Sequence, residues 1–300
     1  MSFITILLPI FFVFGIGFVS QKYLSLDTKN LSRMAIYVMV PFLVFRTFYE
    51  QSINSTYGLL TLYMIGLCLI IILLVTILSK VYRFTEPERC GLVLSSAFMN
   101  NGNYGTPLAF FLFGAAGLEI AIVLMVIQQL LMSTLGVFYA AKGSAQQNGV
   151  KAALQAVKRM PMVYGAMGGI AFQLLHVPIS KTFMQAIDFI ADAAIPFIML
   201  TLGMQLANIS IKAIDWKKLY TSLSLKLIAS PMIAALLVLP MPLDDMTKQI
   251  MIIMAATPTA ANTTMYAIQF QTEPQNVSSA TLISTIMSIV TLPVVIYLAM

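Results

Sequence analysis

The chain has 300 residues, of which 59% are hydrophobic and only 9% are charged, and its formal net charge is +6. Soluble domains carry about 25% charged residues, so this composition excludes a soluble enzyme, a disordered protein and a disulfide-rich secreted scaffold. Apolar runs of about 20 residues recur along the sequence, and each is long enough to cross a bilayer as a helix. The composition therefore predicts an all-α polytopic membrane protein.

The apolar runs predict ten transmembrane helices. The first lacks the basic segment and the cleavage site of a signal peptide, so we expect it to be retained. The ten predicted spans lie near residues 3–20, 31–49, 58–79, 89–113, 118–140, 161–176, 182–205, 218–239, 247–270 and 276–299.

The basic residues predict how these helices are oriented. Thirteen of the seventeen Lys and Arg residues follow spans one, three, five and seven, whereas only three lie on the opposite side. Cytoplasmic loops are enriched in Lys and Arg, so we expect both termini outside the cytoplasm. The positive net charge therefore indicates membrane topology, and we expect no nucleic-acid partner.

The longest polar stretch, residues 141–160, is basic and separates two sets of five spans. An odd number of spans in each set means that the second set is inserted upside down relative to the first. An offset of 159 aligns Asn103 with Asn262, and an offset of 155 aligns Pro41 with Pro196. Inverted repeats of this kind are typical of secondary transporters.

Spans four and nine contain residues that interrupt a helix. Span four has three Asn, two Gly and one Pro within residues 100–107, and span nine has Pro258 and Asn262 among threonines. Unwound backbone inside a membrane is tolerated only where it is buried in protein or lines a cavity, so paired breaks indicate a transport site. The alternative is two ordinary kinks, which the symmetry of two Asn-bearing breaks disfavours.

The chemistry of the breaks favours an anionic substrate. The half-helices that begin after each break direct free N–H groups toward the middle of the membrane, where Asn and Thr side chains add hydrogen bonds. Neither break contains Asp or Glu, which argues against a dedicated Na⁺/H⁺ antiporter. We expect no metal and no cofactor. The candidate binding residues at the breaks are Asn100, Asn101, Asn103, Tyr104, Gly105, Pro258, Thr259, Asn262 and Thr263.

Four charged residues within the predicted spans are further candidates, because intramembrane charges are costly and usually functional. Asp188 lies at about the depth of Arg46, and we predict that these two form a structural ion pair. Asp192 and Lys226 lie nearer mid-span. They either pair with each other or act separately, as a proton-coupling acid and a substrate-facing base.

The chain resembles the auxin efflux carrier family over essentially all ten spans. Gln128, in the middle of span five, matches a family position, so we add it to the binding candidates. The resemblance rests on the order and spacing of Arg33…Pro41, Asn101…Pro107, Gln128…Leu135, Pro161…Tyr164, Asp192…Gly203, Lys226…Pro231, Pro258 and Leu292-Pro293.

This resemblance implies a crossed-helix fold like that of bile acid and sodium–proton transporters, in which spans four and nine cross. Residues 1–49 and 161–206 would form a scaffold with a homodimer surface. Residues 57–140 and 218–300 would form a moving transport domain, and residues 141–160 a cytoplasmic loop. The family's bacterial members are permeases for malonate, malate or related acids, which implies a multi-pass protein of the bacterial inner membrane.

We therefore predict a secondary transporter that moves a small organic carboxylate anion by alternating access. One alternative is a sodium- or proton-coupled symporter of another substrate class, such as a bile-acid-like solute. An intramembrane enzyme is the other alternative, but the predicted mid-membrane positions hold no Ser/His/Asp, paired Asp or metal-ligand cluster.

Overall fold

The computed structural model of the chain describes residues 3–50, 55–144, 149–208 and 215–300. In these residues the secondary structure is helical, apart from one isolated β-bridge between Met99 and Thr259. The chain divides into two compact units. The first unit comprises Met1–Gly58, Gly102–Val126 and Arg159–Asn208, and the second comprises Leu59–Asn101, Ile127–Lys158 and Ile209–Met300.

Six helical stretches of the described residues are long and apolar enough to cross a membrane, so the chain is a polytopic membrane protein, as its composition predicts. Predicted span six corresponds to a shorter helix, α9 (Pro161–Leu174), which has 14 residues. The six stretches are Thr28–Glu50, Thr56–Tyr82, Asn101–Lys142, Lys181–Asn208, Trp216–Val238 and Pro274–Ala299.

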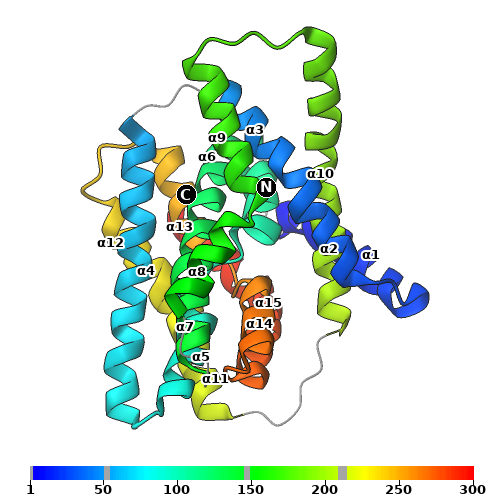
Figure 1. Cartoon of the computed structure of the whole chain (residues 1–300). Helices are drawn as coiled ribbons and strands as arrows, with labels where there is room; N and C mark the ends of the chain where they lie inside the picture. Colours follow the sequence, from blue (N-terminus) through cyan, green and yellow to red (C-terminus); the bar gives the residue numbers. More distant parts are fainter. Residues whose placement is uncertain (1–2, 51–54, 145–148, 209–214) are drawn as a thin grey trace. The chain divides into compact units, whose positions relative to one another are not determined.

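The first unit is built on two close helix pairs, in which α1 packs against α10 and α3 packs against α9 (Figure 1). Gly17 on α1 faces the backbone of Leu200, and Gly203 on α10 faces the backbone of Phe14. A Cβ atom at either glycine would collide with a carbonyl oxygen. Glycine lets two membrane helices approach this closely. The helices are α1 (Phe3–Leu24), α2 (Thr28–Met34), the π-helical turn η1 (Ala35–Met39), α3 (Val40–Glu50), α9 and α10 (Lys181–Asn208).

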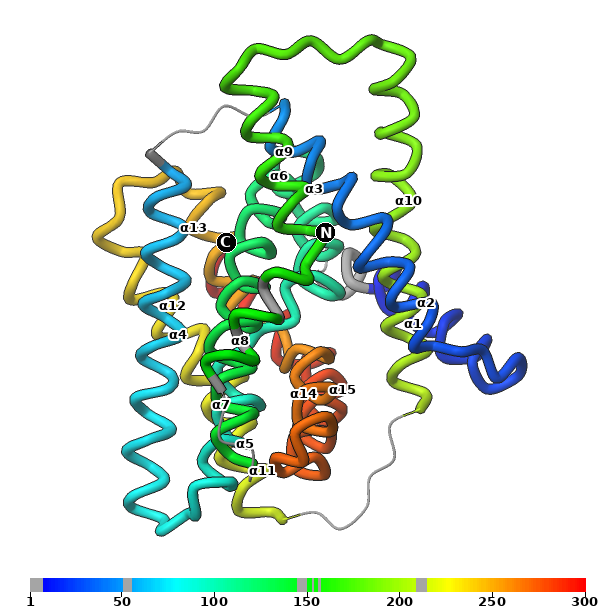
Figure 2. Tube along the Cα trace, in the orientation of Figure 1, coloured from blue at the N-terminus to red at the C-terminus, as the bar shows by residue number. Residues whose placement is uncertain are grey.

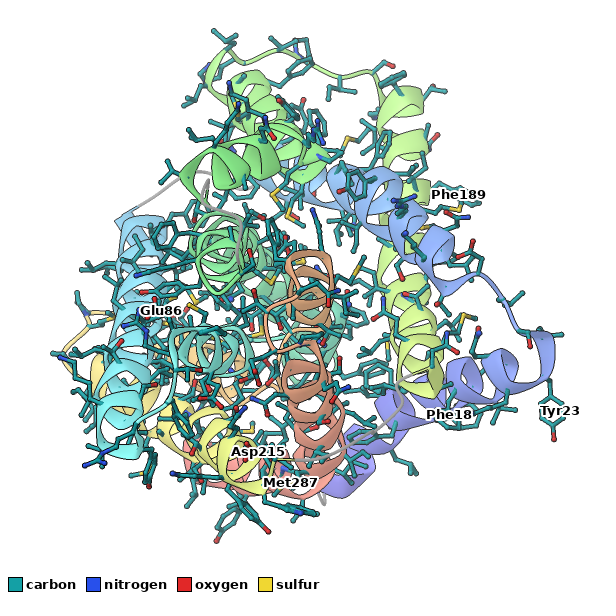
Figure 3. The ribbon with its side chains drawn as sticks, turned by 60° about the horizontal axis from the view of Figure 1, so that its bottom comes forward. Phe18, Tyr23, Glu86, Phe189, Asp215 and Met287 are labelled. Carbon is teal, nitrogen blue, oxygen red and sulfur yellow. The ribbon has the colours of Figure 1, made fainter. Side chains whose placement is uncertain are left out.

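Large apolar side chains project from the surface of the first unit. Tyr23, near the end of α1, is 84% exposed, and Phe189 on α10 is 83% exposed (Figure 3). Lipid tails are as apolar as these side chains, so such exposure is expected on a membrane-embedded surface.

Within the second unit α14 and α15 lie side by side (Figure 2). Most of α6 (Thr106–Leu131) belongs to the first unit. The Tyr63 hydroxyl on α4 donates to the carbonyl oxygen of Met251 on α13 at 2.7 Å. Asp215 and Asp244 accept backbone N–H bonds at the first turns of α11 and α13. The helices are α4 (Ser55–Tyr82), which begins in the first unit, α5 (Glu86–Ser96), α7 (Val137–Lys142), α8 (Gly149–Lys158), α11 (Trp216–Ser224), η4 (Leu225–Ala229), α12 (Ser230–Val238), α13 (Asp245–Ala255), α14 (Ala261–Phe270) and α15 (Pro274–Ala299).

The second half of predicted span four joins span five in one long helical segment, which runs through η2 (Asn101–Gly105), α6 (Thr106–Leu131), η3 (Met132–Gly136) and α7. Gly114 interrupts α6 with φ 67° and ψ −152°. Only glycine adopts such a conformation without strain, so the helical path ends there and starts again. The interruption lies between residues 113 and 118, where the sequence separates spans four and five.

The structure adds two findings on the predicted domain boundaries. The polar stretch 141–160 is not simply a loop, because it contains α8, whose apolar residues Val150 and Leu154 share a face next to Lys151. A ten-residue amphipathic helix contains no long apolar run, so apolar length does not reveal it. Residues 145–148 of the stretch lie outside the described residues. Residues 102–126, expected in the transport domain, group with the first unit.

Candidate transport site

The backbone is unwound at both predicted breaks, and the two breaks meet within the second unit. The first lies between α5, which ends at Ser96, and η2. The second lies between α13, which ends at Ala255, and α14. The Asn100 N–H donates to the carbonyl oxygen of Pro258 at 2.9 Å, and the Ala260 N–H donates to that of Phe98 at 3.1 Å. These antiparallel bonds satisfy backbone groups that the broken helices leave free.

Thr259 reinforces this crossing with its side chain and its backbone. Its hydroxyl donates to the carbonyl oxygen of Ser95 at 2.6 Å, and its N–H donates to the hydroxyl of Ser284 at 3.1 Å. Thr259 was a candidate substrate contact, and these bonds give it a structural role. Its hydroxyl oxygen retains the capacity to accept a hydrogen bond.

Two candidate amides lie at the start of the half-helices. Asn101 is the first residue of η2 and is 1% exposed, and its Oδ1 accepts from the Thr257 hydroxyl at 3.4 Å. Asn262 is the second residue of α14 and is partly exposed. First-turn N–H groups of a helix have no partner within the helix, so both positions suit an anion. Thr263, one residue further on, is buried and donates to the carbonyl oxygen of Ala260 at 2.8 Å.

Two further candidates carry buried polar atoms without a hydrogen-bond partner in the part of the chain that the structure describes. These atoms are Nδ2 of Asn100 and both Nε2 and Oε1 of Gln128, whose side chain is 3% exposed. A Cβ atom on Gly136, two helical turns after Gln128, would lie 3.4 Å from the ring of Phe98 in the first break. Gln128 thus precedes, on the same helical segment, a glycine that packs against the first break.

The remaining span-four candidates belong to the first unit. The ring of Tyr104 is buried with its centroid 5.3 Å from that of Phe14 and 6.3 Å from that of Phe11. Asn103 is half-buried, and Gly105 ends η2. Tyr104 therefore packs among aromatic rings of α1, and a substrate contact for these three residues stays a prediction.

Arg46 binds two carboxylates within the first unit. Its Nη1 atom lies 3.3 Å from Oδ1 of Asp188 and 2.7 Å from Oδ1 of Asp192. The predicted contact between Arg46 and Asp188 is present, whereas the shorter contact with Asp192 was not predicted. Asp188 and Asp192 lie four residues apart on one face of α10, so a single guanidinium reaches both. That spacing was the signal from which the second contact could have been inferred.

Lys226 lies in the π-helical turn η4 of the second unit and is 0% exposed. Its Nζ donates to the carbonyl oxygen of Ala255 at 3.4 Å, and the Ser230 hydroxyl donates to the same oxygen at 3.0 Å. Ala255 is the last residue of α13, so Lys226 lies next to the second break. Since Asp192 and Lys226 belong to different units, their pairing stays a prediction.

A second lysine of this unit forms an ion-pair cluster that the sequence analysis missed. The Nζ of Lys218 lies 2.8 Å from Glu88 and 2.9 Å from Glu273, and 3.5 Å from Asp215. The hydrogen bond from Lys218 is the main cause that lowers the pKa of Glu88 to about 2. Glu88 and Glu273 come from segments distant in sequence from Lys218, so only the fold brings them together.

Comparisons with known proteins find similar transporters. A protein of Methanothermobacter thermautotrophicus named as an uncharacterized transporter is 25% identical, over 89% of this chain and 87% of its own length. A transporter of Methanocaldococcus jannaschii, also uncharacterized, is 23% identical over 87% of this chain and 86% of its own length. A protein of Rhizobium meliloti with the provisional name malonate transporter is 24% identical over 98% of this chain and 94% of its own length. The profile described as membrane transport protein matches residues 2–158 and 150–296, and the chain therefore belongs to this family of auxin efflux carriers.

Proposed function

We propose that the protein is a secondary transporter that moves a small organic carboxylate anion by alternating access, with its binding site at the crossing in the second unit. The observation that carries the proposal is the meeting of two unwound segments, each followed by a half-helix with an Asn among its first two residues. The crossing offers an anion neutral donors and helix N-termini, without an acidic side chain in either break.

The unpartnered atoms of Asn100 and Gln128 support a ligand at this place. A buried amide without a hydrogen bond costs about 1–3 kcal/mol, and native proteins keep few of them. Two amide NH₂ groups are suitable donors to carboxylate oxygens. The name of the Rhizobium meliloti relative agrees with this substrate class.

We further propose ten membrane spans arranged as two inverted five-helix repeats. The helical stretch Asn101–Lys142 has 42 residues. A continuous helix of that length would measure about 63 Å, roughly twice the thickness of the hydrocarbon core, so it accounts for more than one crossing. The interruption at Gly114 supports two spans joined by a sharp bend.

The topology and assembly follow from the same proposal. The excess of basic residues after the odd-numbered spans supports termini outside the cytoplasm of a bacterial inner membrane. In this arrangement residues 1–49 and 161–206 form the scaffold, which joins two copies as a homodimer. The alternative function, a symporter of a bile-acid-like solute, differs in coupling and in ligand size, and an intramembrane enzyme would release a changed product.

Reconstitution into liposomes tests the function. We expect concentrative or exchange uptake of radiolabelled malonate or a comparable small carboxylate, recovered unchanged from the lumen, with little response to replacement of Na⁺ by K⁺. Uptake should disappear in the folded Asn101→Asp variant. Uptake of bile acids alone, or strict dependence on Na⁺, would favour the symporter, and chemically altered substrate would favour an enzyme.

A further inference from the structure

We infer that the ammonium group of Lys226 supplies the positive charge of the transport site, and that the carboxylate of the bound substrate is its counter-ion. The inference rests on the proposed function and extends it, because it assigns the charge of the substrate to one side chain.

The first reason is that Lys226 is buried and has no ion-pair partner among the described residues of its unit. Its side chain is fully buried, and its hydrogen bond goes to the carbonyl oxygen of Ala255. The ion-paired carboxylates in the described part of the second unit bind Arg89, Lys142 or Lys218. An ammonium group in a low-dielectric interior is costly unless an opposite charge accompanies it.

Lys218 provides a contrast within the same unit. It is also buried, yet three carboxylates lie within 3.5 Å of its Nζ. The fold therefore supplies counter-ions to one buried lysine and gives the other a neutral carbonyl. In the first unit, the Asp192 carboxylate has its own cation in Arg46 at 2.7 Å.

The second reason is the place of the ammonium group. Ala255 ends α13, and Thr257, two residues later, donates to Asn101. The neighbours of Lys226 that the structure describes are neutral groups. The Ser230 hydroxyl shares the Ala255 oxygen, and Cys68 contributes a thiol, which is neutral near pH 7. A carboxylate held by the amides of the crossing would thus meet one positive charge at its edge.

A binding experiment can separate charge recognition from a structural role. The affinity of purified protein is measured for a carboxylate and for its uncharged amide, malonate against malonamide, in the native protein, in Lys226→Gln and in Lys226→Arg. We expect Lys226→Gln to weaken malonate binding about 100-fold and to leave malonamide binding unchanged. Lys226→Arg keeps the charge and should retain the preference for malonate.

Stability without ligand gives an independent readout. A lysine whose counter-ion is the substrate is not needed for folding, so Lys226→Met should unfold at the same temperature as the native protein or at a higher one. A variant that fails to fold would overturn the inference, as would native malonate affinity in Lys226→Gln. Rescue of a destabilised Lys226→Gln protein by Asp192→Asn would identify Asp192 as the counter-ion and overturn it too.

The outcomes also separate this inference from the proposed function. If the native protein transports malonate and Lys226→Gln binds it equally well, the function stands and the assignment of Lys226 is wrong. If the folded native protein binds no small carboxylate, both are wrong.

Discussion

The backbone N–H of Asn100 donates a 2.9 Å hydrogen bond to the carbonyl oxygen of Pro258, and this bond joins the two broken helices of the second unit. A second bond, between Ala260 and Phe98, runs beside it. Backbone groups inside a membrane must be satisfied within the protein, so each break serves as the hydrogen-bonding partner of the other. The breaks are therefore mutually supporting elements of the fold.

Asn101→Asp is expected to reduce carboxylate affinity by at least about 100-fold, because it places a negative charge beside the bound anion. Asn101→Ala should weaken binding about tenfold, through loss of a hydrogen bond. The Asp variant keeps the oxygen that accepts from Thr257, so it should fold normally. Asn262→Asp should act in the same way. Affinity and thermal unfolding are measured on the same preparations, and undiminished affinity of folded Asn101→Asp would contradict the site.

Gly17→Ala is expected to destabilise the first unit by about 1–3 kcal/mol, because its Cβ would collide with the backbone of Leu200 on α10. Gly15, two residues earlier on the same helix, is a matched control with no atom within 4 Å of an added Cβ. Gly15→Ala should be neutral or stabilising by up to about 1 kcal/mol, because alanine favours a helix. Unfolding temperatures in detergent compare the two, and equal values would show that the α1–α10 contact is loose.

The Glu88–Lys218 ion pair predicts a loss of stability in acid. The pKa of Glu88 is lowered to about 2, below its ordinary value near 4.5, so the folded state favours the charged carboxylate. The contribution of this ion pair to the free energy of unfolding is fully present above about pH 4.5. It is lost as the pH falls toward 2, by at most about 1.4 kcal/mol per pH unit. Glu88→Gln can preserve the capping box with Thr85, so it removes the ion pair selectively. The stability of this variant should depend less on pH between 5 and 3; an unchanged profile would argue against the pair.

Cysteine labelling tests the orientation. In a background without Cys68 and Cys90, a cysteine replacing Lys151 on α8 should react with a membrane-impermeant maleimide only after the cells are opened. A cysteine replacing Lys181, the first residue of α10, should react in intact cells. The reverse pattern would overturn the topology that the basic residues predict. Both native thiols are buried, so a low background is expected.

Much of the fold could be predicted because apolar length and helix-breaking residues leave direct signals in a sequence. The places of both breaks followed from Asn, Gly and Pro within apolar runs, and the separation of spans four and five near Gly114 followed from apolar length. Helix α8 was missed because it is short and amphipathic. The place of residues 102–126 could not be predicted, because packing such as that of Tyr104 on Phe14 depends on tertiary contacts.

The candidate site was predictable in its residue types but not in its bonds. The sequence singled out Asn101, Thr259 and Lys226, yet it could not show that Thr259 uses its hydroxyl to hold Ser95. Nor could it show that one arginine would reach both Asp188 and Asp192. Hydrogen-bond partners far apart in the chain are set by how the helices pack, and that information is spread over the whole sequence.

The bridge between Met99 and Thr259 has a consequence for how this protein could diversify. Its framework bonds at Asn100 and Ala260 are made by main-chain atoms, so they do not depend on which side chains occupy those positions. Evolution can thus exchange the amides around the crossing while the backbone geometry persists. A new substrate preference then requires a few side-chain replacements and no redesign of the helices, which makes the crossing a natural target for engineering altered selectivity.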